Sequence, residues 1–303
     1  MNILPDVIFH SLRSIHKGGA GTLVMSGGAT PGTKTTPNSP AAWRPDVTTY
    51  LPSDVVPDAL IVQTATIVGR IEGDEPAVRI PYAADDGVAG FVAEGTEIPD
   101  AAQGFDEVVV TTNKVAALGK YSAETLAQPE AARLIVDSLS QLITSKANIA
   151  YLSNASAPTG LLGSATAGGA LGNNLDAVVD AIAAIEDDGG QATHVIASPS
   201  AWASVSKLKQ ATGSNASLLP SGNAASERTL LGVPVLVSNA APDGPLLVLD
   251  KRSVIAASSP IRLARSEDAF FSSDVTAIRV TWRLGWSVMH AERVIKLTVT
   301  ATP

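Results

Sequence analysis

The chain has 303 residues, with 21 Lys and Arg against 29 Asp and Glu and a formal net charge of −8. The absence of cysteine excludes a disulfide framework and a thiolate metal site. Hydrophobic residues make up 45%, enough for a sizeable core. No apolar run approaches the roughly 18 residues of a membrane span, and the N-terminal MNILPDVIF lacks the basic region of a signal peptide. We therefore expect a soluble, untargeted protein.

Residues 17–45 are rich in Gly, Pro, Ser and Thr and show no sustained hydrophobic period. This composition is typical of an extended arm rather than a domain. The segment GGATPGTKT, which begins at Gly27, is similar to a phosphate-binding loop, but Thr33 separates the last glycine from Lys34. Pro37 and Pro40 also forbid the helix that such a loop requires, so we interpret the segment as part of the arm.

Residues 64–113 contain the β-branched pieces AVRIPY and EVVVTT, separated by several glycines. The pattern predicts a long two-stranded excursion. A ribbon of two strands is marginally stable alone in water, so we expect it to need a partner surface.

The next segment changes to a helical period. Apolar residues recur three or four positions apart, which predicts one face of a helix that begins at Pro129, spans about 28 residues and ends before Pro158. The positions of this stripe are Ala132, Val136, Leu139, Ile143, Ala147 and Ala150.

Residues 158–265 alternate helix and strand signals, which is typical of an α/β layer. We expect helices over 175–185 and after Pro199, and strands at HVIAS, GVPVLVS and PLLVLD. Near the C-terminus, residues 278–284 and 295–299 alternate apolar and polar side chains, which predicts two half-buried strands.

No catalytic or metal-binding constellation stands out. Ser204 and Lys207 form a lone Ser-x-x-Lys in an amphipathic segment, and the carboxylate pairs adjoin glycines, as turn residues do. The four histidines His10, His16, His194 and His290 include no close ligand pair. An acidic, aromatic-poor chain also disfavours tight DNA binding. We therefore predict no enzyme activity, no cofactor and no metal.

Several segments follow one another in a recognisable order. FVAEGTEIP begins at Phe91 and YSAETLA at Tyr121, and the long helix then leads to PTGLLG at Pro158. Further along the chain, ASPSAWASVSKLKQATG begins at Ala197 and LLGVPVLVSNAAP at Leu230. This order resembles the tailed-phage major capsid protein family, whose fold is shared with encapsulin shells. The resemblance covers about residues 47–299.

The resemblance implies an α+β fold with four parts. These are an N-terminal arm (1–48), an extended β loop (64–113), a peripheral domain with a long spine helix (49–63, 114–157 and 266–303) and an axial domain (158–265). It implies a major capsid protein of the virion, assembled in the bacterial cytoplasm, that forms pentamers and hexamers of an icosahedral shell around double-stranded DNA.

The resemblance also implies partners. The expected ones are many copies of the chain itself, a portal and a decoration protein, with DNA enclosed without sequence-specific binding and no membrane. A separate scaffolding protein is expected because the arm starts within a few residues of Met1. Some family members form an isopeptide bond from a loop lysine, but this chain has no lysine between Lys34 and Lys114, so we expect no covalent lattice.

Two other functions remain open at this stage. An encapsulin-like nanocompartment shares the architecture, and a neighbouring portal or terminase gene would exclude it. A soluble hydrolase built on Ser and Asp residues of 158–265 belongs to a different class, and an esterase or phosphatase screen would detect it.

Charge is distributed unevenly along the chain. Residues 54–107 carry 2 basic and 12 acidic groups, whereas 251–303 carry 8 basic and 4 acidic groups. We predict that acidic loop residues of one copy meet basic residues of another, although both sets could instead face water. The candidates are Asp85, Asp86, Glu94 and Glu97 on the loop, and Arg262, Arg265, Arg279 and Arg283 near the C-terminal strands.

Overall fold

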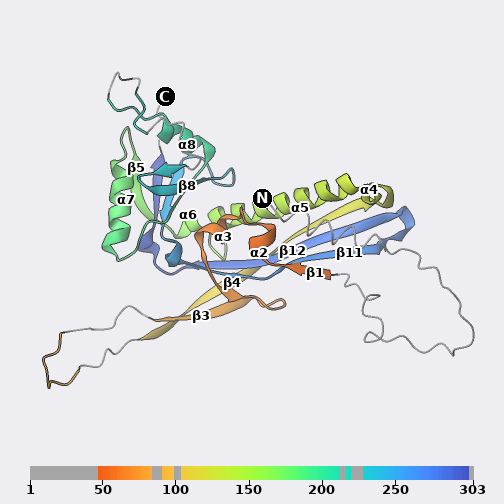
Figure 1. The fold of residues 1–303 in the computed structure, drawn as a ribbon, viewed down its shortest axis with the longest axis horizontal. Helices are drawn as coiled ribbons and strands as arrows, with labels where there is room; N and C mark the ends of the chain where they lie inside the picture. Colours follow the sequence, from red (N-terminus) through yellow and green to blue (C-terminus); the bar gives the residue numbers. More distant parts are fainter. Residues whose placement is uncertain are drawn as a thin grey trace, which may run out of the picture. The chain divides into compact units, whose positions relative to one another are not determined.

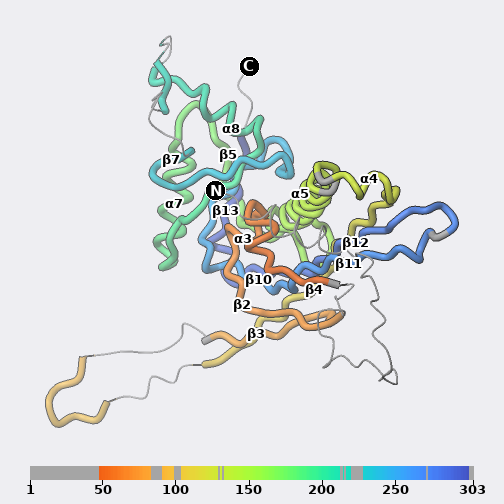
Figure 2. Tube along the Cα trace, turned by 45° about the vertical axis from the view of Figure 1, so that its right-hand side comes forward, coloured from red at the N-terminus to blue at the C-terminus, as the bar shows by residue number. Residues whose placement is uncertain are grey.

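The computed structural model describes residues 47–83, 91–98, 104–211, 214, 216–219 and 228–299. Most of the predicted arm, together with Asp85 and Asp86, lies outside these residues. The chain divides into two compact units, drawn in Figures 1 and 2. The first unit contains residues up to 57, 115–144 and 260–282, and the second contains 58–114, 145–259 and 283 onward.

The elements follow in chain order. The helices are α2 (Pro52–Val55), α3 (Leu60–Thr64), α4 (Ala123–Ala127), α5 (Pro129–Ser153), α6 (Leu161–Ser164), α7 (Asp176–Asp187) and α8 (Pro199–Ser206), with 3-10 turns η3 (Lys251–Ser253), η4 (Phe271–Ser273) and η5 (Ala291–Arg293). The strands are β1 (Val47–Tyr50), β2 (Thr66–Arg70), β3 (Ala77–Ala83), β4 (Phe105–Ser122), β5 (Thr166–Leu171), β6 (His194–Ala197), β7 (Thr229–Leu230), β8 (Val233–Val237), β9 (Pro245–Leu249), β10 (Val254–Ser258), β11 (Ile261–Phe270), β12 (Val275–Val288) and β13 (Val294–Val299).

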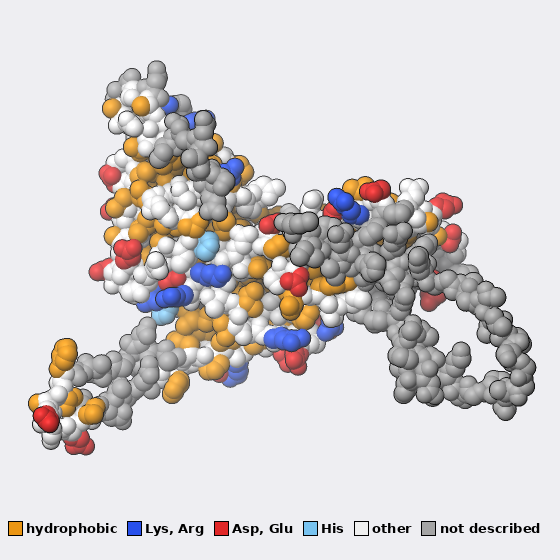
Figure 3. Space-filling model, viewed as in Figure 1, with side chains coloured by type: hydrophobic (Ala, Val, Ile, Leu, Met, Phe, Trp, Pro, Cys, Tyr) orange, Lys and Arg blue, Asp and Glu red, His pale blue; other side chains and the backbone are white. Residues whose placement is uncertain are grey.

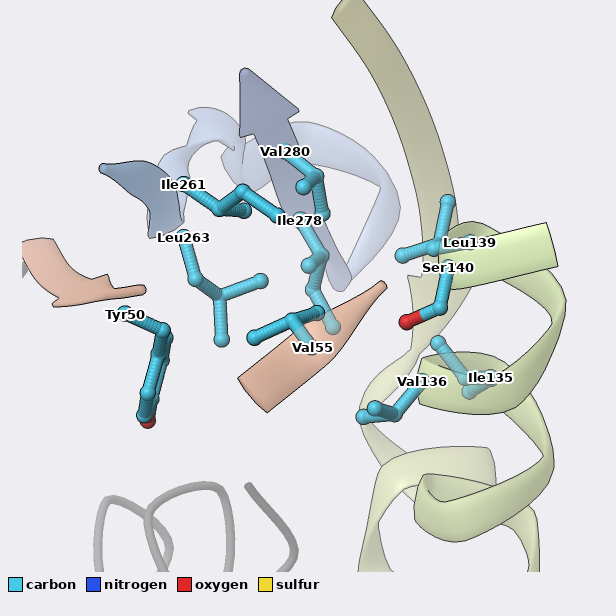
Figure 4. Close-up of a pocket in the computed structure, with 10 residues that line it drawn as sticks. All are labelled: Tyr50, Val55, Ile135, Val136, Leu139, Ser140, Ile261, Leu263, Ile278 and Val280. Carbon is cyan, nitrogen blue, oxygen red and sulfur yellow. The ribbon is translucent and has the colours of Figure 1, made fainter. Parts of the chain in front are cut away.

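The first unit packs helix α5 against an antiparallel sheet of β1, β11 and the first part of β12. Tyr50 pairs with Ile261, and Leu263 pairs with Val280. Apolar side chains alternate along these strands and so gather on one face. That face and α5 border a small apolar pocket (Figure 4). The pocket is lined by Tyr50, Val55, Ile135, Val136, Leu139, Ser140, Ile261, Leu263, Ile278 and Val280.

Helix α5 has 25 residues and begins at Pro129, as the sequence predicts. Proline suits a first helical position because its missing N–H has no partner there, and Glu130 places an acidic group in the first turn. The predicted stripe is confirmed at Val136, Leu139 and Ile143, which are buried. Leu134, Leu142 and Ile149 lie off this stripe and are exposed. The helix therefore carries one buried and one exposed apolar surface.

The second unit contains a six-stranded sheet in the order β5-β13-β9-β6-β8-β7. Helices α7 and α8 pack on one face of it, against Val195, Val248 and Leu297. Ser198 caps α8 by accepting a hydrogen bond from the Ala201 amide at 3.1 Å. The predicted α/β layer over 158–265 is thus present, but β13 also lies within its sheet, between β5 and β9. The resemblance to capsid proteins implies instead that residues 266–303 belong with the spine helix.

Another part of the second unit joins β2 and the end of β12 through β10. β2 runs parallel to β10, and β10 pairs antiparallel with β12. A buried cluster lies beside it: the ring of Tyr151 meets Trp286 edge-on at 5.4 Å, and its hydroxyl lies 3.0 Å from that of Thr64. Trp286 donates its indole N–H to the Thr159 carbonyl at 2.8 Å. The large aromatic groups here are thus fixed by polar contacts as well as packing.

The predicted two-stranded ribbon is formed by β3 and β4, which run side by side in Figure 2. Arg79 and Glu107 form an ion pair across the strands at 2.7 Å, and Tyr82 bonds Asp106 at 3.3 Å. Within the described ranges, residues 77–83 pair with 105–111, whereas β2 joins β10 and β4 continues to Ser122. β2 therefore pairs outside the ribbon although it falls within the expected 64–113.

Candidate functional site

The described part of the loop between β3 and β4 forms a turn, with one carboxylate within it and another directly after it. The Thr96 amide donates to the Ala93 carbonyl at 3.1 Å, and Gly95 adopts a positive φ of 83°. Glycine tolerates this conformation because it has no Cβ. Glu94 and Glu97 are both exposed, and neither has an ion-pair partner among the residues described. The turn presents two negative charges to the solvent.

Large apolar side chains flank this turn. Phe91 is 112% exposed relative to the reference residue, and Ile98 is 78% exposed. Figure 3 shows hydrophobic and acidic side chains gathered on this segment. These two residues are not among the site candidates predicted from the sequence. The presence of large apolar residues in an acidic loop with glycines is a signal that could have identified them. Such exposure favours a loop that is covered by another surface.

Two of the four candidate arginines form ion pairs and hydrogen bonds with other residues of the same chain. Arg265 forms an ion pair with Glu267, and its side chain is only 11% exposed. Arg283 donates to Asp74 at 3.1 Å, to the Thr112 hydroxyl at 3.1 Å and to the Glu75 carbonyl at 3.2 Å. These contacts are consistent with a structural role for both side chains.

The other two arginines lie on the outer face of the first unit's sheet. Arg262 pairs with Thr281, and Ala264 pairs with Arg279, so the two arginines are diagonal neighbours on adjacent strands. Both are exposed, and neither forms an ion pair or hydrogen bond with a residue in the described ranges. Along these strands the two arginines alternate with residues whose buried side chains face α5, namely Ile261, Leu263, Ile278 and Val280. Successive side chains of a strand point to opposite faces, so Arg262 and Arg279 lie on the face of the sheet away from α5.

Three side chains with potential metal-ligand atoms lie close together. Ligand atoms of Asp188, His290 and Glu292 lie within 4.8 Å of one another. However, the Asp188 carboxylate already accepts from the Arg293 Nε at 2.7 Å, so an internal cation balances its charge. We assign no metal to the group.

His194 was predicted to be a structural residue. It is half-buried on β6, and its Nδ1 lies 3.1 Å from the Thr193 hydroxyl. Burial, with a smaller contribution from the charge of Lys251, lowers the pKa of its imidazole below the usual 6.5. Among the described residues, no helix is long and apolar enough to cross a membrane.

A sequence model of the phage capsid family matches residues 48–299. A search of curated protein sequences gives no match. Solved structures match over most of the chain. The capsid of an empty GTA particle, computed with C5 symmetry, has a TM-score of 0.63 at 20% identity and covers 90% of this chain and 100% of its own. A chain from Gordonia phage Cozz has a TM-score of 0.63 at 15% identity, covering 94% of each chain. One from Microbacterium phage Oxtober96 has a TM-score of 0.60 at 15% identity, covering 88% of this chain and 99% of its own.

These matches confirm two predictions from the sequence. The resemblance to capsid proteins is confirmed by the family match, whose limits nearly coincide with the expected 47–299. The α+β capsid fold is confirmed by structures that cover nine tenths of the chain.

Proposed function

The chain belongs to the phage capsid family and is a structural, non-enzymatic protein of a virion capsid, and from this premise we propose that its copies form the pentamers and hexamers of an icosahedral shell around double-stranded DNA. The observation that carries the proposal is the family match over residues 48–299. The C5 symmetry stated for the related GTA capsid supports a five-fold arrangement of subunits.

Exposed apolar side chains support assembly independently of the family. Phe91 and Ile98 on the loop, and Leu134 and Leu142 on α5, are each more than half exposed. Subunit contacts would remove such side chains from water, and about 25 cal/mol is gained for each Å² of apolar surface buried. Many repeated contacts of this kind would stabilise a shell.

We also propose roles for the parts of the chain. Residues 158–265 serve as the axial domain, residues 64–113 as the loop that contacts a neighbour, and residues 1–48 as an arm. The portion with α5 serves as the peripheral domain (49–63, 114–157 and 266–303), while β13 at the end of its last segment completes the sheet of the axial domain. A separate scaffolding protein, a portal and a decoration protein are the proposed partners, and the DNA is held without sequence-specific contacts.

Co-expression with the products of the neighbouring genes tests the proposal. We expect the protein to sediment as large particles whose interior holds double-stranded DNA protected from added nuclease. Protein that stays monomeric at high concentration in analytical ultracentrifugation would refute assembly. Particles filled with enzyme and free of DNA would favour an encapsulin-like compartment instead.

A second candidate is the shell of a GTA particle. The likeness to both empty and native GTA capsids, at 20% and 19% identity, favours it as much as the phage likenesses favour a viral shell. Sequencing the protected DNA separates the two, since a viral shell holds the genome that encodes this chain together with its portal and terminase.

A further inference from the structure

We propose that Arg262 and Arg279 form a receptor for the turn that carries Glu94 and Glu97 in a second copy of this chain. The inference rests on the proposed assembly and names the contact that joins neighbouring subunits. It narrows the eight candidates of the sequence analysis to four, because Arg265 and Arg283 have partners inside the chain and Asp85 and Asp86 lie outside the described residues.

The receptor is preorganised by the sheet. Arg262 and Arg279 sit at diagonal positions of the β11 and β12 ladder, where diagonal neighbours are about 7–8 Å apart. Both strands are held on their other face by buried side chains, so the backbone under the arginines is fixed. Two cations in this arrangement repel one another until an anion lies between them, and a guanidinium matches a carboxylate with two parallel hydrogen bonds.

An apolar residue lies on the same face of the sheet as the two arginines. Leu51 follows β1 in an extended conformation and is 59% exposed. Because alternate residues of an extended chain point the same way, Leu51 lies on the side of Thr49, which pairs with Arg262. The receptor therefore combines two positive charges with an apolar neighbour.

The loop offers the complementary set. Glu94 lies within the turn held by the Thr96 amide and Glu97 follows it, and Phe91 and Ile98 are exposed on the same segment. Two carboxylates can meet the two guanidinium groups while an apolar side chain covers Leu51. A nucleic-acid phosphate would satisfy the charges but would leave Phe91 and Ile98 in water, so we favour a second copy of the chain as the occupant.

Charge exchange between copies tests this contact. One variant carries Arg262→Glu and Arg279→Glu, and the other carries Glu94→Arg and Glu97→Arg. In each variant alone, loop and receptor have the same sign. Mixed together, the acidic loop of the first variant faces the basic receptor of the second, and the basic loop of the second faces the acidic receptor of the first. A chain with all four changes restores the match with itself.

We expect each double variant alone to assemble about tenfold less than wild type and the fourfold variant to recover to within about twofold. The mixture should recover less than the fourfold variant, because two kinds of subunit cannot alternate around a ring of five. Assembly is measured as the fraction of protein in shells on a sucrose gradient. The control is Lys207→Glu with Arg228→Glu, which reverses two exposed charges outside α5, the loop turn and the receptor and should assemble as wild type does. Circular dichroism checks that each variant is folded.

Two results would overturn the contact. The first is normal assembly of the Arg262→Glu and Arg279→Glu variant, and a loss of enclosed nucleic acid from those shells would make the arginines a phosphate site. The second is failure of the fourfold variant to recover although the chain folds. Absence of shells from the wild-type protein would instead refute the proposed function.

Discussion

Arginine residues close together in the sequence have different environments in the structure. Arg265 pairs with Ile278 and shares the strand face of Ile261 and Leu263, so its position relative to these apolar residues could have indicated a partly buried side chain. The partner of Arg283 could not be predicted, because Asp74 lies 209 positions away and no local pattern joins them. The residue types identify the charged groups of the candidate site, whereas the tertiary structure determines which of these groups are already paired within the chain.

Gly285 permits close approach of two strands. A Cβ at this position would lie 2.3 Å from the Thr111 carbonyl oxygen and 3.0 Å from its carbon. Since backbone atoms cannot move aside as a flexible side chain can, we expect Gly285→Ala to lower the free energy of unfolding by about 1–3 kcal/mol. Gly172→Ala is the control, because a Cβ there meets nothing within 4 Å. Urea unfolding compares them, and equal stability of the two variants would contradict the close approach.

The lowered pKa of His194 predicts a loss of stability in acid. Well above pH 6.5 the imidazole is neutral in both the folded and the unfolded chain, so it adds no pH dependence. Below pH 6.5 the unfolded chain binds a proton that the folded chain resists, so the free energy of unfolding falls as the pH drops toward the folded pKa. Between pH 7.5 and 5, His194→Gln should lose less stability than wild type in urea unfolding. Identical pH profiles would mean that His194 titrates normally in the folded chain.

At the scale of the elements, local patterns predicted what forms but not always what it pairs with. The helical stripe gave α5, and the alternation of residues 278–284 and 295–299 gave the central part of β12 and most of β13. The patterns did not separate these strands, although β13 joins the six-stranded sheet and β12 the larger one. They also missed that β2 leaves the ribbon for β10. Both outcomes depend on contacts between distant segments, which periodicity does not record.

Two leucines of α5 test the assignment of its faces. Leu139 is 4% exposed and lines the pocket under the sheet, whereas Leu142 is 58% exposed. We expect Leu139→Ala to destabilise the unassembled subunit by about 2–5 kcal/mol, because it removes buried methyl groups and enlarges the pocket. Leu142→Ala should change stability by no more than about 0.5 kcal/mol. Chemical unfolding of dilute subunits compares them, and an equal loss in both would contradict the assigned faces.

At the scale of the whole molecule, the uneven charge and the exposed apolar surface indicate a protein that buries these surfaces in contacts between its own copies. The net charge is −10 in residues 54–107 and +4 in residues 251–303, from the counts given above. Each exposed ion pair contributes only about 0.2–1 kcal/mol, so assembly would depend on repetition of such pairs with apolar contacts around a ring.

The shell should have no covalent links through the loop. No lysine lies between Lys34 and Lys114, so residues 64–113 offer no side-chain amine to attack a carboxamide. Particles boiled in denaturant should therefore give a single band at the subunit mass of 31.0 kDa. A ladder of linked oligomers under the same conditions would contradict this expectation.

The central claim is that copies of this chain close into a shell, and cryo-electron microscopy of the purified particles tests it most directly. The account predicts closed particles with five-fold and six-fold capsomers, each subunit showing the long helix α5 and a loop turn in contact with the Arg262 face of a neighbour. Monomers alone, or particles in which subunits touch without five-fold vertices, would contradict it.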